Sequence, residues 1–221
     1  MSLLTTLVQP PQIFTKSQVA SGVTPPLGLA YLAGYLLHNN CHVKVVDALG
    51  EAPEKITAFE KKTYLRGLPI EVIVDKIDPE SAIVGISNLF SFAYPAVEKL
   101  AEAIHLQYPD MVIVLGGHHP SACYREILTK SPAVSYVARG EEGEESLLRL
   151  VQYLDGTAAY SDLTGLATRE NGKVVDLKPT KRFKNIEQEN IPFPARHLLP
   201  MEITSEHKRG MDLQRGGGHR F

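Results

Sequence analysis

Cysteine and surplus charge are both scarce in this chain. It has 221 residues but only two cysteines, and 23 Lys and Arg stand against 25 Asp and Glu, for a net charge of -2. Cys41 and Cys123 lie far apart and form no CxxC or other metal-type spacing, so we interpret both as reduced structural thiols. The balanced charge excludes the basic footprint that nucleic-acid binding needs.

Long apolar runs and a signal sequence are absent too. No apolar stretch approaches the roughly 18 residues of a membrane span. Residues 1–9 are too short, and lack the basic start, for a signal peptide. We therefore expect a cytoplasmic protein without a membrane span and without a nucleic-acid partner.

Phosphate-binding loops are also missing. No Gly-x-Gly-x-x-Gly follows the first expected strand, and no Gly-x-x-x-x-Gly-Lys loop occurs anywhere. Neither a dinucleotide nor a nucleotide phosphate has its usual cradle here, which disfavours a flavin or nucleotide enzyme.

Short apolar strands and helical patterns alternate through the first two thirds of the chain. This alternation predicts an α/β fold with a doubly wound, flavodoxin-like or Rossmann-like, five-stranded parallel sheet. We expect the strands at residues 3–8, 42–47, 83–87, 111–115 and 134–139. The main helices are expected at residues 27–38, with Thr24 as N-cap, and at 95–108, 121–130 and 146–154.

The remaining segments carry turn and loop signals. Residues 9–23 read as a loop, and residues 52–78 as two helical pieces separated by Gly67-Leu68-Pro69. Asn171-Gly172 predicts a small β-hairpin of residues 163–170 and 173–177. Residues 178–221, rich in Pro and Gly, predict an extended C-terminal strap without a packed element.

Unusual loops follow the expected strands, at the edge where a parallel sheet binds its ligand. The apolar strand at 111–115 stops on Gly116, Gly117, His118 and His119, and Ser87 opens a loop with two phenylalanines. Glycines, hydroxyls and amides beside aromatic rings suit a large, flat, mostly neutral ligand that needs close backbone contact. That description fits a corrinoid better than a nucleotide.

Five motifs together resemble the amino-terminal cobalamin-binding domain of cobalamin-dependent radical S-adenosylmethionine (SAM) enzymes. They are TPPLGLAYLA at 24–33, VVD at 45–47, VGIS at 84–87, GGHHP at 116–120 and RGEEGE at 139–144. IPFPARHLL at 191–199 resembles the linker before the catalytic barrel of that family. The resemblance implies a cobalamin-binding domain over 1–155, a hairpin and linker over 156–200, and a flexible tail over 201–221 leading to a radical SAM barrel.

The strand ends and the resemblance define a set of expected cofactor-binding residues. Gly140 and Glu141 belong to it through the resemblance alone. The set is Thr24, Pro25, Gly28, Leu29, Asp47, Ser87, Asn88, Phe90, Gly116, Gly117, His118, His119, Gly140 and Glu141.

Some roles within this set remain open. Because neighbouring residues point in different directions, at most one of His118 and His119 faces a ligand. A pocket contact, helix capping, solvent exposure and a direct cobalt bond are the alternatives. Asp47 is interpreted as a polar contact or helix cap, and we expect neither a catalytic residue nor a protein metal ligand.

The chain departs from the family in two motifs. Residues up to Phe221 contain no Cys-x-x-x-Cys-x-x-Cys, so no iron–sulfur cluster is expected on this polypeptide and it is not catalytic alone. The resemblance places the cluster and SAM in a missing barrel, supplied in cis or in trans. Asp-x-His-x-x-Gly is absent too, which implies cobalamin with its base displaced and no histidine in its place.

The function expected is therefore a corrinoid-binding module of a radical SAM enzyme of methyltransferase type. The competing hypothesis is a flavodoxin-like regulatory or protein-interaction domain that has kept the fold and lost the ligand.

Overall fold

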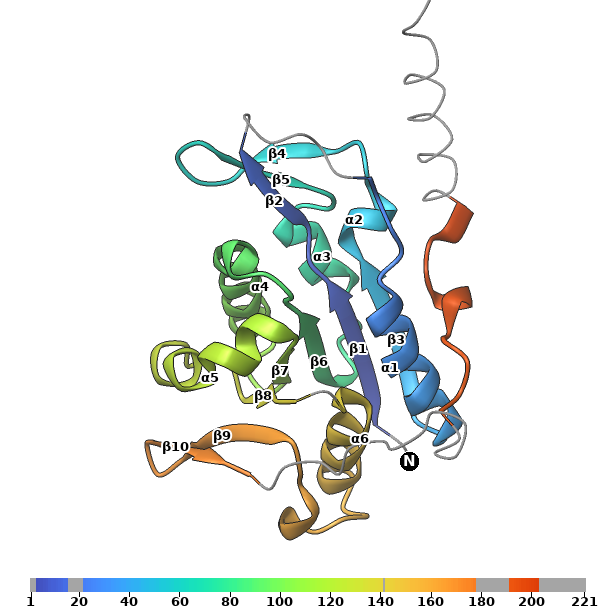
Figure 1. The fold of residues 1–221 in the computed structure, drawn as a ribbon, viewed down its shortest axis with the longest axis vertical. Coiled ribbons are helices and arrows are strands. Elements are labelled where there is room, and N and C mark those ends of the chain that lie inside the picture. The colour runs from blue at the N-terminus through green and yellow to red at the C-terminus, as the bar shows by residue number, and fades with distance from the viewer. Residues whose placement is uncertain (1–2, 16–21, 141, 178–190, 203–221) are drawn as a thin grey trace, which may run out of the picture.

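Five parallel strands form the centre of the molecule in the computed structural model, which describes residues 3–15, 22–140, 142–177 and 191–202. They lie in the order β3-β1-β6-β7-β8 (Figure 1). This is the flavodoxin-like order, with its topological switch point between β1 and β6. The doubly wound prediction is confirmed. The strands are β1 (Leu4–Gln9), β3 (His42–Asp47), β6 (Ser81–Ser87), β7 (Val112–Gly116) and β8 (Tyr136–Ala138).

The predicted hairpin extends this sheet to seven strands among the described residues, two more than expected. β9 (Leu166–Glu170) pairs antiparallel with β8, and β10 (Lys173–Asp176) pairs with β9. Asn171 and Gly172 both have positive φ, 50° and 76°, as a tight hairpin turn requires. An isolated hairpin is marginal in water, so this one is stabilised by the edge of β8.

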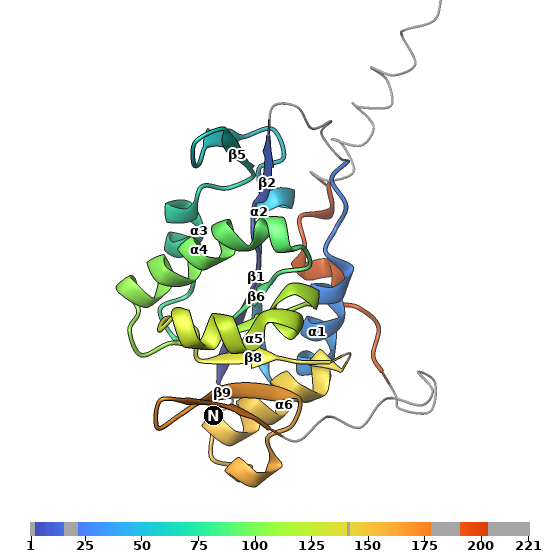
Figure 2. The ribbon, with the colours of Figure 1, turned by 60° about the vertical axis from the view of Figure 1, so that its left-hand side comes forward.

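Helices cover both faces of the sheet (Figure 2). On β1, Val8 packs towards one face and Leu7 towards the other, and both are buried. One face is covered by α1 (Leu27–His38) and α6 (Gly143–Leu154). The other is covered by α3 (Ile70–Lys76), α4 (Tyr94–Gln107) and α5 (His118–Lys130).

Of the two helical pieces predicted in residues 52–78, the one after Gly67-Leu68-Pro69 is confirmed as α3, and the one before it is wrong. The segment holds β4 (Ile56–Ala58), β5 (Thr63–Arg66) and α3, after a short α2 (Ala48–Glu51). β2 (Gln12–Thr15), within the expected loop, pairs with β5, giving a separate sheet beyond the carboxyl end of β1 (Figure 1). Ile13 and Leu65 pack there against Ala96 of α4, so tertiary burial overrides the polar, helix-prone composition.

One expected helix cap and one expected helix start also differ from the structure. Thr24 is exposed and caps nothing, because α1 begins after Pro26, which forms no side-chain cap hydrogen bond. α5 begins three residues before the expected position, which places His118 and His119 in its first turn.

The described part of the strap, residues 191–202, packs against α1 (Figures 1 and 2). The amide of Ala195 donates to the carbonyl of Ala30 at 2.8 Å, and a Cβ on Gly34 would lie 2.5 Å from the carbonyl oxygen of Phe193. Ala195 and Leu199 are buried. The expectation of no packed element is wrong for this segment, which includes the 3-10 turn η3 (Arg196–Leu198). Residues 178–190 and 203–221 lie outside the described residues.

Arg169 of β9 ties the hairpin to the end of α5. Its guanidinium donates to the carbonyls of Leu128, Ser131, Pro132 and Val134 at 2.5 to 3.0 Å. Truncation leaves these carbonyls without their charged donor, so we expect Arg169→Ala to lower the free energy of unfolding by about 2–3 kcal/mol.

Urea unfolding followed by circular dichroism measures this loss. Lys173→Ala, at an exposed position of the same hairpin, is the matched control and should change stability by less than about 0.5 kcal/mol. Equal stability of the two variants would contradict the role assigned to Arg169.

Within the described residues, no helix is both long and apolar enough to cross a bilayer.

Candidate functional site

The ends of β6 and β7 form the centre of the candidate site. Ser87 pairs with Gly116, and the amide of Asn88 donates to the Gly116 carbonyl at 2.7 Å. Gly117 has φ 111°, and a Cβ there would lie 2.4 Å from the carbonyl oxygen of Asn88. Only glycine allows the two loops to approach this closely.

Asn88 is a buried polar residue whose side chain has no hydrogen-bond partner in the described part of the chain. It is 2% exposed, and neither its Oδ1 nor its Nδ2 makes a hydrogen bond to any of the described residues. Leaving a buried amide unpaired costs about 1–3 kcal/mol, so such groups are rare and call for a reason. Here the group lies next to the topological switch point, where folds of this type bind ligands.

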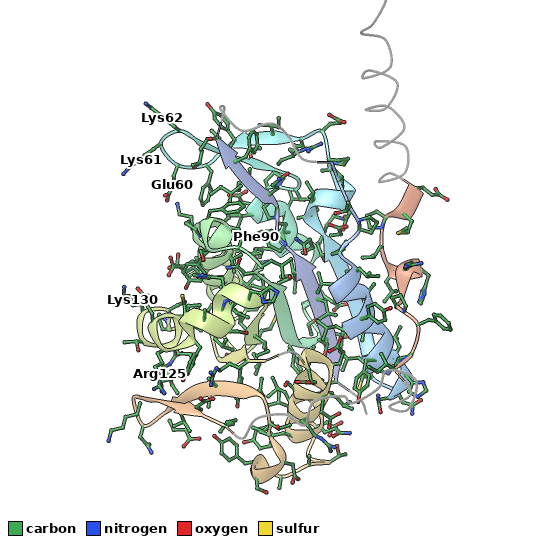
Figure 3. All side chains as sticks on the ribbon, in the orientation of Figure 1. Glu60, Lys61, Lys62, Phe90, Arg125 and Lys130 are labelled. Atoms are coloured by element: carbon green, nitrogen blue, oxygen red, sulfur yellow. The ribbon has the colours of Figure 1, made fainter. Side chains whose placement is uncertain are left out.

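The loop after Asn88 presents apolar side chains to the outside. Leu89, Phe90 and Phe92 are 51%, 59% and 57% exposed. The rings of Phe90 and Phe92 stack, with centroids 5.4 Å apart and planes 14° apart. Phe90 lies beyond the carboxyl end of β6, between the small sheet and α5 (Figure 3). The stacked rings form an apolar surface at the sheet edge.

Leu89, Ser91 and Phe92 were missed as individual site residues, although the loop itself was expected. The sequence does indicate an apolar loop here, because three large apolar residues, Leu89, Phe90 and Phe92, follow a strand end without a helical or strand period. Their exposure depends on the η1 turn (Ser91–Ala93), which the sequence did not indicate.

The two histidines have different surroundings. His118 is exposed, whereas His119 is half-buried and its Nδ1 lies 3.0 Å from Ser91 Oγ. The His119 ring also packs on Tyr94, with centroids 4.9 Å apart. His119 therefore contacts the loop of residues 88–93, which carries Phe90 and Phe92 and is called the aromatic loop below.

The remaining expected residues lie around this centre. At the start of α1, Thr24 and Gly28 are exposed, Pro25 is half-buried, and Leu29 is 4% exposed within the core between α1 and the sheet. Gly140 is exposed with φ 96°, just after β8. Glu141 lies outside the described residues.

Asp47 is separated from this centre, because β1 lies between β3 and β6. It is 2% exposed, and its Oδ1 accepts from the amide of Gly50 at 2.9 Å, which caps α2. Burial raises the pKa of Asp47 to about 6, although the Gly50 hydrogen bond opposes the shift. Its geometry is that of a helix cap.

This pKa gives a pH-dependent prediction for Asp47→Asn. The folded state holds the proton of Asp47 up to about pH 6, whereas the unfolded chain releases it near 3.9. The free energy of unfolding therefore falls as the pH rises from about 4 to about 6. The difference between the two pKa values corresponds to a loss of up to roughly 3 kcal/mol. Asparagine caps equally well without charge, so the variant should gain stability over the native chain at pH 8 and little at pH 4.

Urea unfolding of the native chain and of Asp47→Asn at pH 4 and pH 8 tests this prediction. The other titrating groups are the same in both proteins, so their contributions cancel when the two free energies of unfolding are subtracted. A gain that is the same at pH 4 and pH 8 would contradict it.

The fold and the candidate site define a doubly wound domain whose ligand-binding edge lies at the carboxyl ends of its parallel strands. The sequence has none of the glycine-rich phosphate-binding motifs that often accompany such an edge. The family model described as "B12 binding domain" matches residues 17–151. The chain therefore belongs to the B12-binding domain family, which confirms the resemblance and the expected cofactor class.

Curated relatives and solved structures agree with this assignment. The chain is 33% identical to an uncharacterized methyltransferase of Pyrococcus horikoshii over 89% of its own length and 39% of the relative's. It is 26% identical to the anaerobic magnesium-protoporphyrin IX monomethyl ester cyclase of a Synechocystis species, over 82% of its own length and 34% of the relative's. The chain thus spans about two fifths of the length of these relatives or less.

The fold matches that of OxsB, a cobalamin-dependent SAM radical enzyme, in its structure with aqua-cobalamin and SAM bound. The TM-score is 0.67 at 18% identity, covering 93% of this chain and 25% of that one.

The residues at the sheet edge fit a corrin. A corrin ring is flat, with amides on its rim, which can pair with the orphaned amide of Asn88. Its macrocycle suits the stacked rings of Phe90 and Phe92. Gly116 leaves the edge open, because the nearest contact of a Cβ there, among the described residues, would be the Cβ of Ala138 at 3.9 Å.

Proposed function

We propose that this chain binds cobalamin across the carboxyl ends of β6 and β7, as the corrinoid-binding module of a radical SAM enzyme of methyltransferase type. The observation that carries the proposal is the unpaired, buried amide of Asn88 beside an exposed aromatic loop. Membership of the B12-binding domain family supports it.

Each part of the edge has a role in this proposal. The amide of Asn88 pairs with an amide on the rim of the corrin. Phe90 and Phe92 cover the macrocycle and exclude water, while Gly116 and Gly117 keep the backbone close. When bound, cobalamin supplies a cobalt centre able to carry a methyl group.

A second group of residues completes the proposed contact surface. It comprises the start of α1 and the loop after β8, together with Ser87 at the end of β6 and His118 at the start of α5. The group is Thr24, Pro25, Gly28, Ser87, His118, Gly140 and Glu141.

The catalytic chemistry is proposed to come from a separate part. The longer length of the relatives supports a radical SAM barrel in cis or in trans, holding the iron–sulfur cluster and SAM. Because one relative is named a methyltransferase and another a cyclase, the barrel decides the reaction.

The domain division is proposed on the same basis. Residues 1–155 form the cobalamin-binding domain, residues 156–200 the hairpin and linker, and residues 201–221 a tail towards the barrel. The hairpin in the sheet edge and the strap on α1 support a linker fixed to this domain. A cytoplasmic location is supported by the two free cysteines, of which Cys41 is buried.

Ligand-dependent stabilisation tests the proposed function. Hydroxocobalamin at a hundred times its dissociation constant should raise the free energy of unfolding by about 2.7 kcal/mol. Urea unfolding of the full chain with and without the corrinoid measures this, with flavin mononucleotide as the matched control. An unchanged curve would favour the ligand-free interaction domain.

A further inference from the structure

The loop of residues 88–93 is held at two points. At its start, the amide of Asn88 donates to the Gly116 carbonyl at 2.7 Å. Further along, Ser91 Oγ lies 3.0 Å from His119 Nδ1. The exposed Phe90 and Phe92 lie between these points or beside them, so their placement depends on both.

His119 reaches this loop from a different element. It belongs to the first turn of α5, and its ring is fixed by packing on Tyr94, the first residue of α4. One side chain thus joins the β7–α5 connection to the β6–α4 connection. These two connections flank the proposed cofactor edge.

We propose that His119 is a positioning residue of the proposed cobalamin site, acting through Ser91. This inference rests on the proposed function. His119 holds the aromatic loop in place before the ligand arrives, so less conformational freedom is lost on binding. Its Nδ1 is occupied by Ser91, and its ring faces Tyr94.

A double-mutant cycle separates this role from cobalt ligation. His119→Phe keeps a ring on Tyr94 but removes the nitrogen, and Ser91→Ala removes the partner hydroxyl. Each single variant should weaken hydroxocobalamin binding by about fivefold, the typical effect of one neutral hydrogen bond. The double variant should lose no more than either single variant, because both remove the same interaction.

Spectroscopy supplies an independent measurement. The electron paramagnetic resonance spectrum of bound cob(II)alamin should be the same in the native chain, His119→Phe and Ser91→Ala. His38→Phe, at the exposed far end of α1, is the matched control and should bind as the native chain does. Circular dichroism and urea unfolding verify that all variants fold.

The outcomes are distinct. Loss of nitrogen hyperfine structure in His119→Phe alone would show cobalt ligation and overturn the inference. Additive effects of the two substitutions, or no effect of Ser91→Ala, would overturn it as well. Failure of the native chain to bind hydroxocobalamin would instead refute the proposed function.

Discussion

Gly117→Ala should weaken cobalamin binding at least about a hundredfold and lower the free energy of unfolding by about 3 kcal/mol or more. Residue 117 has φ 111° and ψ -178°, a region open almost only to glycine, where a side chain costs about 1–3 kcal/mol. The added Cβ would also lie 2.4 Å from the carbonyl oxygen of Asn88, so the two loops must separate. Separation breaks the contact between the β6 and β7 ends, and affinity should fall at least about a hundredfold.

Gly156→Ala is the matched control for Gly117→Ala. Gly156 also has positive φ, 81°, but a Cβ there meets nothing within 4 Å, and it lies after α6, away from the candidate site. Gly156→Ala should lower the free energy of unfolding by about 1 kcal/mol and leave the affinity for the corrinoid unchanged. Equal losses of stability in both variants, with binding retained in Gly117→Ala, would contradict the account of the two loops.

Asn88→Leu should separate binding from stability. Removing a buried, unpaired amide removes its desolvation penalty, so the ligand-free protein should become more stable by about 1 kcal/mol. The same substitution removes the proposed partner of the corrin amides, and affinity for hydroxocobalamin should fall at least about tenfold. Urea unfolding without ligand and a spectral titration measure the two effects.

Thr5→Val is the matched control for Asn88→Leu. The hydroxyl of Thr5 is also buried and has no partner among the residues that the structure describes, but it lies near the amino-terminal end of β1, opposite the proposed site. This variant should gain stability without losing affinity. If Asn88→Leu loses stability and keeps its affinity, the amide serves the fold and the site assignment is wrong.

The parallel sheet could be predicted from sequence because its strands are short apolar runs bounded by turn residues. β3 and α1 begin and end at the predicted residues, since their signals are local. β2, β4 and β5 could not be predicted in the same way. They are three or four residues long, and the pairing of β2 with β5 joins segments about fifty residues apart.

The candidate site shows the same division. Gly117 could be identified from the glycine pair after an apolar strand, and the structure shows why a side chain is excluded there. The unpaired state of Asn88 and the contact of His119 with Ser91 depend on side-chain packing between separate connections. The anchoring of the strap through Ala195 likewise depends on contacts distant in sequence.

A spectral titration of the full chain with hydroxocobalamin tests the central claim most directly. We expect a saturable change in the ultraviolet–visible spectrum, of the kind that accompanies displacement of the lower base from cobalt. Reduction to cob(II)alamin should then give an electron paramagnetic resonance signal without nitrogen hyperfine structure from that base. An unchanged spectrum at high micromolar protein would contradict the account.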